Sequence, residues 1–199
     1  MSAEPLSKAN PFDVLFKNVW IRLMYLLFCA MSIIVGWFVL GPSHPWRGAI
    51  VVWGTMSLVP AVPAPALVRR VPRQWFRVPA GERLLHRMLG VGVFGWLLNV
   101  SGWNRRVLEP LRGFSGKRAA LLSLEQSVQA SVVAHGICFA IHVLFAVLAL
   151  FSRHPLAGAL WALVPGVIVH LYPVLLQRST MLRLQPLLDK MAPADCVGC

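Results

Sequence analysis

Acidic residues are scarce in this chain: it has 7 Asp and Glu against 19 Lys and Arg, and only 13% of its 199 residues are charged. Apolar residues make up 57%, which is too large a share for an ordinary soluble domain. The net charge of +12 would suit nucleic acid, but the basic residues lie beside long apolar runs. We therefore expect a membrane protein without a nucleic-acid partner, whose basic residues face anionic lipid headgroups.

Familiar catalytic and nucleotide-binding signatures are also missing. The chain has no GxSxG nucleophile elbow, no P-loop and no GxGxxG fingerprint. Its four cysteines do not form a disulfide framework, because Cys29 and Cys138 fall inside apolar runs and Cys196 and Cys199 form an isolated CxxC. Two thiols are too few for a zinc site, so we expect neither a metal nor a cofactor.

Four apolar stretches reach the length of about 20 residues that a helix needs to cross a bilayer. They are residues 21–40, 48–68, 130–151 and 156–176. The first is not followed by a signal-peptide cleavage site and is long enough to be a true span. The second contains Pro60, Pro63 and Pro65, and we expect it either to bend or to end early.

Basic residues are distributed unevenly between the segments that join these stretches. The N-terminal part up to Arg22, the middle segment and the C-terminal tail hold 17 of the 19, and the two short loops hold only Arg47 and Arg153. Because positive segments stay cytoplasmic, we expect both termini on that side. The predicted fold class is an all-α integral membrane protein with four transmembrane helices, in the bacterial cytoplasmic (inner) membrane.

The apolar stretches divide the chain into five segments. These are an N-terminal interfacial arm (1–20), a first transmembrane hairpin (21–68), a basic segment (69–129), a second transmembrane hairpin (130–178) and a cytoplasmic tail (179–199). Within the basic segment, residues 84–100 form a further apolar run. A fifth crossing there would move the C-terminus outside, so we expect an interfacial or re-entrant helix. A helix that starts at Ser115 or Lys117 is expected to continue into the third span.

Three histidines are the candidates for chemistry inside the membrane, because the third and fourth stretches contain no Asp, Glu, Lys or Arg. At the helical rise, His135 and His170 lie about 8 and 9 Å from the cytoplasmic ends of their spans. Neighbouring antiparallel helices would therefore bring these two imidazoles to the same depth. His142 lies two turns deeper than His135, and we expect it to bond to a neighbouring carbonyl or hydroxyl.

A histidine at this depth can act as a general base toward a hydroxyl of an amphiphile whose head lies at the same level. Nearby arginines can hold an anionic donor, such as the phosphates of an acyl carrier. Two histidines without an adjacent carboxylate or cysteine make a poor metal site.

Two stretches resemble a known family. Residues 70–76 are followed by 82–91, and residues 170–178 are followed by Arg183 and Leu184. Together with His135, they resemble the small bacterial membrane proteins of the glycosyl-4,4'-diaponeurosporenoate acyltransferase family, over about residues 68–190. The resemblance implies an all-helical fold and the transfer of a fatty acyl group to a sugar hydroxyl of a glycosylated carotenoid. The family pattern has a glutamate where this chain has Val132, and Tyr-Asn-Arg where it has Ser, Thr and Met at 179–181.

Depth, chemistry and the resemblance together lead us to expect roles for individual residues. His135 would be the general base, and His170 and Gln177 would orient the acceptor or the oxyanion. The residues that would bind the substrate or the donor's phosphates are Glu82, Tyr172, Arg178 and Arg183. The partners would be a membrane lipid or glycosylated isoprenoid acceptor and an activated acyl donor, either acyl-CoA or acyl-carrier protein.

Two other function classes compete with this hypothesis. A non-enzymatic scaffold or assembly protein of a lipid or pigment pathway is favoured by Val132 and by residues 179–181, which depart from the family pattern. Ion-coupled transport is disfavoured, because the spans show no internal symmetry and carry no acidic residue at mid-membrane.

Overall fold

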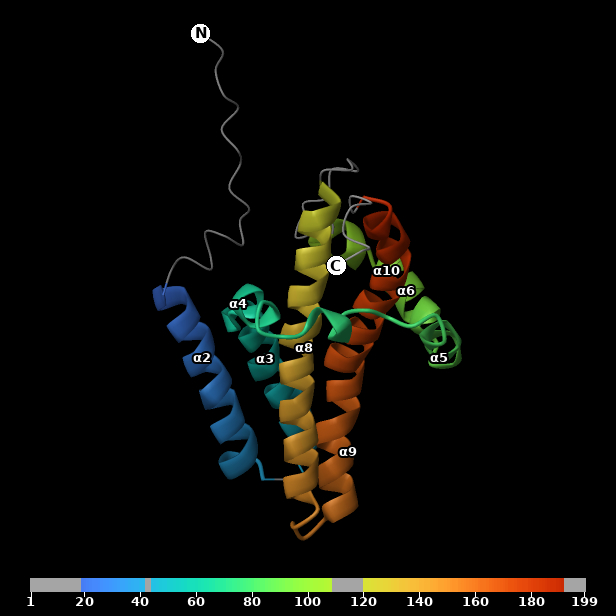
Figure 1. The fold of residues 1–199 in the computed structure, drawn as a ribbon. Helices are drawn as coiled ribbons and strands as arrows, with labels where there is room; N and C mark the ends of the chain where they lie inside the picture. Colours follow the sequence, from blue (N-terminus) through green and yellow to red (C-terminus); the bar gives the residue numbers. More distant parts are fainter. Residues whose placement is uncertain (1–18, 42–43, 109–119, 192–199) are drawn as a thin grey trace.

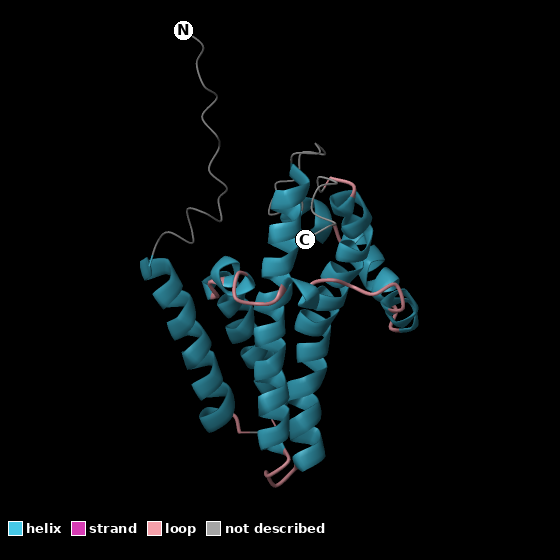
Figure 2. Ribbon diagram, in the orientation of Figure 1, coloured by secondary structure: helices cyan, strands magenta, loops and turns pink. Residues whose placement is uncertain are grey.

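The structure, a computed structural model, describes residues 19–41, 44–108 and 120–191. All regular structure in these residues is helical, and no strand occurs among them (Figure 2). The predicted arm 1–20 lies almost wholly outside the described residues, as do Ser115, Lys117, Cys196 and Cys199.

The helices build a bundle with a side arm. Helices α2, α3, α8 and the long rod formed by α9, η5 and α10 lie along one another, and α5 and α6 lie against one end of α10 (Figure 1). In chain order the elements are α2 (Val19–Ile34), η1 (Val35–Val39), α3 (Pro45–Ala61), α4 (Ala64–Val68), η2 (Arg73–Trp75), α5 (Glu82–Met88), α6 (Val91–Val100), η3 (Asn104–Leu108), α8 (Leu121–Ala149), α9 (Pro155–Gly166), η5 (Val167–Leu171) and α10 (Tyr172–Asp189).

Three of these helices are long and apolar enough to cross a membrane: Val19–Val39, Leu121–Ala149 and Pro155–Asp189. Helix α3 has 17 residues and measures about 26 Å at the helical rise. It ends at Ala61, one residue after Pro60, so the early end that the prolines predicted is confirmed. Helix α8 begins at Leu121, well before residue 130, and runs through the third predicted span.

Helix α3 packs between α2 and α9 through glycines. A Cβ atom at Gly54 would lie 2.7 Å from the Cβ of Ser32 in α2, and one at Gly48 would lie 2.3 Å from the Trp161 carbonyl oxygen in α9. Small residues allow membrane helices to approach this closely. Because α3 also contacts α8, the middle turn of α3 lies at the centre of the bundle.

Arg47 lies in the first turn of α3 and is fully buried, whereas the sequence suggested a loop. Its guanidinium carbon is 4.4 Å from the ring centroid of Trp37, and its Nη2 donates to the Phe145 carbonyl at 3.4 Å. Cation–π and carbonyl contacts offset the loss of hydration. The helix starts before Arg47 because Pro45 suits the first helical position and His44 caps it, accepting from the Trp46 N–H.

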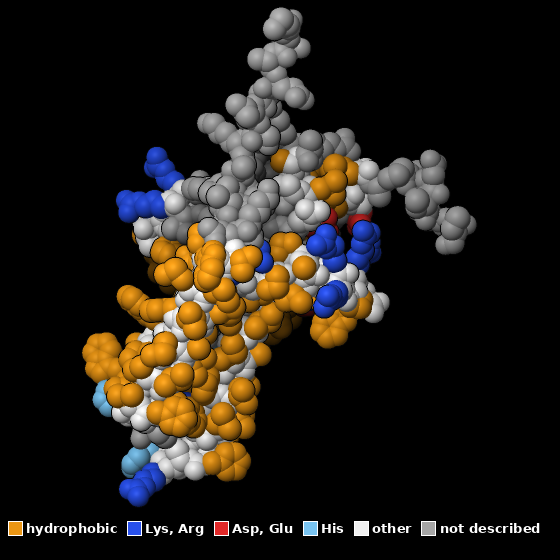
Figure 3. Space-filling view, turned by 90° about the vertical axis from the view of Figure 1, so that its left-hand side faces the viewer, with side chains coloured by type: hydrophobic (Ala, Val, Ile, Leu, Met, Phe, Trp, Pro, Cys, Tyr) orange, Lys and Arg blue, Asp and Glu red, His pale blue; other side chains and the backbone are white. Residues whose placement is uncertain are grey.

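The outside of the bundle is apolar. Large side chains such as Phe28, Leu144 and Trp161 are exposed. Figure 3 shows apolar side chains covering much of one face, with most of the visible Lys and Arg gathered toward one end. An apolar surface of this extent suits lipid and would cause aggregation in water.

The apolar run 84–100 forms two helices. Gly90 separates α5 from α6 with φ of 67°, a left-handed conformation that favours glycine. Helix α6 has 10 residues, about 15 Å, which is too short to cross a bilayer. It packs on α10, where a Cβ at Gly95 would lie 3.4 Å from the Leu176 side chain, and it exposes Trp96 and Leu97.

Candidate active site

Three histidines from the last two long helices meet inside the bundle. Nδ1 of His170 lies 3.2 Å from Nδ1 of His135. The ring centroid of His170 is 5.4 Å from that of His135 and 5.3 Å from that of His142. The structure therefore brings together the two imidazoles whose depths the sequence matched. Nδ1 of His142 lies 2.8 Å from the Ala162 carbonyl oxygen, which confirms the expected bond to a carbonyl.

Thr55 of α3 completes the cluster, and the sequence analysis missed it. Its hydroxyl oxygen lies 2.8 Å from His170 Nε2, 3.1 Å from His142 Nε2 and 3.0 Å from the Val51 carbonyl oxygen. A threonine in an apolar helix commonly bonds to the carbonyl four residues earlier, so nothing local pointed to the histidines. The available signal was that Thr55 and Ser57 are the hydroxyl residues of the second apolar stretch.

The helix that carries His170 changes its geometry just before that residue. Pro165 removes one N–H from the helix, and the chain then passes into the π-helical turn η5. Such turns frequently occur at functional sites. Gly166 leaves room for His142, because a Cβ there would lie 2.5 Å from the Cβ of His142. The segment from Pro165 through η5 therefore carries His170 and also leaves space for the side chain of His142.

Starting from the Ala162 carbonyl, one order of donors and acceptors along the cluster can be written for neutral imidazoles. The Ala162 carbonyl only accepts, so Nδ1 of a neutral His142 carries the proton and its Nε2 accepts. The single proton of the Thr55 hydroxyl lies within hydrogen-bonding distance of that Nε2 and of the Val51 and Val52 carbonyl oxygens. When it is donated to Nε2 of His142, the hydroxyl accepts from Nε2 of His170. Nδ1 of His170 is then an acceptor, and Nδ1 of His135 donates to it.

This order leaves a lone pair on Nε2 of His135. His135 is partly exposed, whereas His142, His170 and Thr55 are fully buried. A neutral imidazole held through Nδ1, with Nε2 accessible, has the arrangement that a general base requires. An orienting carboxylate would bind Nδ1 of His135, but Val132 stands where the family pattern has glutamate. In this chain His170 occupies that position on Nδ1 of His135 instead.

The described residues offer no ready metal centre. Among them, no group of three or more His, Cys, Asp and Glu side chains is placed to hold a metal ion. The ring nitrogens of His142 and His170 are taken up by Thr55, Ala162 and His135.

Glu82 and Arg178, both predicted to bind substrate or donor, bind each other. Nη2 and Nε of Arg178 lie 2.5 and 2.9 Å from the two carboxylate oxygens of Glu82, and Nη1 donates to the Trp75 carbonyl at 3.2 Å. The hydrogen bonds from Arg178 lower the pKa of Glu82. This ion pair joins α10 to α5, so a donor phosphate would have to compete with the carboxylate for Arg178.

Tyr172 and Gln177 have different surroundings. The Tyr172 hydroxyl donates to the Leu89 carbonyl at 2.9 Å, and its ring lies 5.1 Å from that of Phe94. Tyr172 therefore ties α10 to the junction of α5 and α6. Gln177 is buried and follows His170 by two turns, on the same face of the helix.

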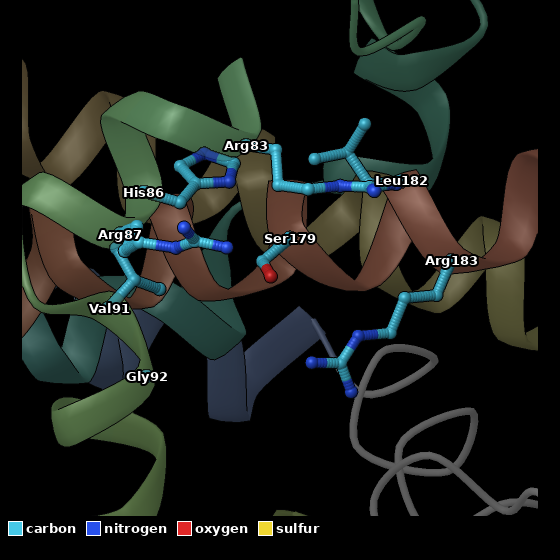
Figure 4. A pocket seen from close by; sticks show the side chains of 8 residues that line it. All are labelled: Arg83, His86, Arg87, Val91, Gly92, Ser179, Leu182 and Arg183. Atoms are coloured by element: carbon cyan, nitrogen blue, oxygen red, sulfur yellow. The ribbon is translucent and has the colours of Figure 1, made fainter. Parts of the chain in front are cut away.

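Arg183 borders a hollow of about 310 Å³ between α5, α6 and α10, away from the histidine cluster. Figure 4 shows the residues that line it: Arg83, His86, Arg87, Val91, Gly92, Ser179, Leu182 and Arg183. The predicted site residues thus fall into two groups: one around His135 and His170, and one with Glu82, Arg178 and Arg183 where α10 faces α5.

Comparison with known proteins adds one match. The family model described as glycosyl-4,4'-diaponeurosporenoate acyltransferase matches residues 69–190, more than half of the chain. The matched range includes His135, His170 and the lining of the hollow, but not Thr55. No curated protein and no solved structure matches the chain.

Proposed function

This chain belongs to the glycosyl-4,4'-diaponeurosporenoate acyltransferase family, and we propose that it transfers a fatty acyl group to a hydroxyl of a glycosylated carotenoid or related glycolipid at the cytoplasmic leaflet. The family assignment supports an acyltransferase role in the carotenoid pathway. The observation that carries the chemical proposal is the chain of close polar contacts from Ala162 through His142, Thr55 and His170 to His135. In the proton order that we propose for it, Nε2 of His135 is unprotonated.

In the proposed reaction, Nε2 of His135 accepts the proton of the sugar hydroxyl as its oxygen attacks the carbonyl carbon of an acyl thioester. The new C–O bond forms, the C–S bond breaks, and the departing thiolate takes the proton from Nε2. The Nδ1–H of His135 donates to His170 throughout, which holds the ring and stabilises the imidazolium. Gln177, on the face of His170, orients the acceptor or the oxyanion.

We further propose that α3 is a fourth crossing and that both termini are cytoplasmic. In this arrangement the basic residues of 69–106 and 178–190 fall on one side, and Arg47 and Arg153 on the other, in agreement with the positive-inside rule. His135 is 14 residues from the end of α8 at Ala149, about 21 Å, and His170 is 15 residues from Pro155, about 22 Å. In an apolar core of about 30 Å, both lie about 8–9 Å below the cytoplasmic boundary.

The test replaces His135 and follows the acylated product. His135→Ala and His135→Gln are expressed in place of the wild-type chain, and lipid and pigment extracts are analysed by mass spectrometry. We expect the product to fall by a factor of about 100 or more, with the amount of protein in the membrane unchanged. Gly136→Ala, next to His135 with open space around its Cβ position, is the matched control. Product at the wild-type level from His135→Ala would remove this residue from the mechanism.

The scaffold hypothesis is distinguished by removal of the whole protein. An acyltransferase leaves an unacylated precursor that accumulates, and a chain with His135→Ala behaves in the same way. A scaffold instead shifts several unrelated products together, and the His135→Ala chain then restores them.

A further inference from the structure

The hollow beside Arg183 carries positive charge from two helices. Helix α5 contributes Arg83 and Arg87, four residues apart on one face, and α10 contributes Arg183. No acidic residue lines the hollow, and none of the three guanidinium groups forms an ion pair or hydrogen bond within the described part of the chain. Like charges gathered in this way repel one another unless an anion lies between them.

His86 provides a second, independent indication of a ligand. The residue is only 5% exposed, and neither ring nitrogen has a hydrogen-bond partner among the described residues. The nearest carboxylate oxygen, on Glu82, is 3.7 Å from Nε2, which is too far for a hydrogen bond. A buried polar group without a partner is unfavourable, and an anion in the hollow would supply the acceptor that this imidazole lacks.

Shape also favours a compact anionic group. Figure 4 shows the Arg87 guanidinium extending toward Ser179, with Arg183 bordering the same space from α10. The small Ser179 side chain leaves this space open and adds a hydroxyl donor. Arginine forks and a hydroxyl are the groups that hold phosphate oxygens in proteins.

The position of the hollow relates it to the histidine cluster. Along the helix, Ser179 follows His170 by nine residues and Arg183 by 13, so the hollow begins about 14 Å from His170 and extends to about 20 Å. A coenzyme A thioester carries a diphosphate at one end of a flexible pantetheine arm and the acyl carbonyl at the other. Bound in the hollow, such a molecule can extend its arm along α10 toward His135.

We propose that Arg83, Arg87, Arg183 and His86 bind the diphosphate of an acyl-coenzyme A donor. This inference rests on the proposed function and names its donor. Three guanidinium groups and an imidazole match the charge of a diphosphate better than the single phosphodiester of an acyl-carrier protein or a lipid headgroup. Arg178 is not part of this site, because Glu82 already neutralises it.

Binding of coenzyme A to the purified full chain in detergent tests the proposal. By titration calorimetry we expect Arg87→Gln and Arg183→Gln each to weaken binding at least tenfold, and Arg70→Gln, outside the hollow, to leave it unchanged. Ser179→Asp places a negative charge in the hollow and is expected to abolish binding, while a thermal melt verifies that each variant is folded. The proposal would be overturned if Arg87→Gln, Arg183→Gln and Ser179→Asp all bound coenzyme A as tightly as the wild type does.

The identity of the anion is tested by competition. We expect inorganic diphosphate to displace coenzyme A, and 4'-phosphopantetheine and vesicles containing phosphatidylglycerol to displace it at least tenfold less well. Equal competition by phosphopantetheine would assign the hollow to a carrier protein, and equal competition by vesicles would assign it to lipid; either result contradicts the coenzyme A site.

His135→Ala separates this inference from the proposed function. The variant is expected to bind coenzyme A as the wild type does and to make no product. If the wild type makes product but does not bind coenzyme A, the inference fails and the function stands. If His135→Ala binds coenzyme A and still transfers acyl groups, His135 is not the general base, whereas the coenzyme A site is retained.

Discussion

Gly166 lies directly against His142: a Cβ atom added at Gly166 would be 2.5 Å from the Cβ and 2.6 Å from the Cγ of that histidine. The glycine is therefore what allows the imidazole of His142 to fit between α8 and the rod of α9, η5 and α10. From there its Nε2 reaches the Thr55 hydroxyl.

Gly166→Ala is expected to push the His142 ring away from Thr55 and to disturb the cluster. We predict at least a tenfold loss of acylated product and, because the core is overpacked, a destabilisation of about 1–3 kcal/mol. Product is measured by mass spectrometry, and stability by thermal unfolding in detergent. Gly136→Ala introduces the same methyl group into open space on α8 and should match the wild type. Full activity of Gly166→Ala would mean that the position of His142 does not matter.

Thr55→Val replaces a hydroxyl by a methyl group of similar size. It leaves Nε2 of His142 and of His170 without the hydroxyl that each contacts, at a cost of about 1–3 kcal/mol, and it removes the hydroxyl through which the proposed proton order runs. We predict a drop in kcat of about tenfold or more with KM little changed. A general base contributes a rate factor of about 10² to 10⁴, and a base that is poorly positioned loses part of it. Thr55→Ser keeps the hydroxyl and should recover most of kcat. A Thr55→Val enzyme with wild-type kcat would show that the proton order is not needed.

The ion pair between Glu82 and Arg178 predicts a dependence of stability on pH. Because Arg178 lowers the pKa of Glu82, the folded chain holds the Glu82 proton less tightly than the unfolded chain does. The stabilisation is therefore complete above the ordinary glutamate value of about 4.3 and is lost as the pH falls through the lower, folded value. Melting temperatures measured between pH 3 and 7 should fall less steeply at the acid end for Glu82→Gln than for the wild type.

At pH 7, Glu82→Gln should be less stable than the wild type by about 1–2 kcal/mol, between the values for exposed and buried pairs. Asp189→Asn is the control, since Asp189 pairs with Arg77 at 3.4 Å and both side chains are more than half exposed (62% and 77%). This substitution should have little effect on the melting temperature. Equal melting curves for Glu82→Gln and Asp189→Asn would contradict a structural role of the Glu82 pair.

Gly48→Ala is expected to separate α3 from α9. The added Cβ would lie 2.3 Å from the backbone carbonyl oxygen of Trp161, which cannot move without its helix, so we predict a destabilisation of at least about 1–3 kcal/mol. Gly92→Ala in α6 meets open space and should keep or slightly raise stability through helix propensity. The two variants are compared by thermal unfolding in detergent; equal stability would show that α3 and α9 are less closely packed than the structure describes.

His135 and His170 illustrate how much a helical repeat predicts. Their distances from the ends of two apolar stretches were enough to place the rings at one depth, since the helical rise is constant. Thr55 was not predictable in the same way, because its own span is interrupted by prolines and its partners are 87 and 115 residues away. The same limit applied to Glu82 and Arg178, which were predicted as separate ligand-binding residues although they are 96 residues apart and bind each other.

The sequence by itself determined the helical, membrane-embedded character of this protein, the family and the two histidines of interest, because hydropathy, charge and helical rise are local properties of the chain. Tertiary structure alone decided that Thr55 links His170 to His142, that Arg47 is buried, and that Arg83, Arg87 and Arg183 surround one hollow. These relationships depend on which faces of separate helices meet, and close packing at positions such as Gly48 and Gly166 sets those faces.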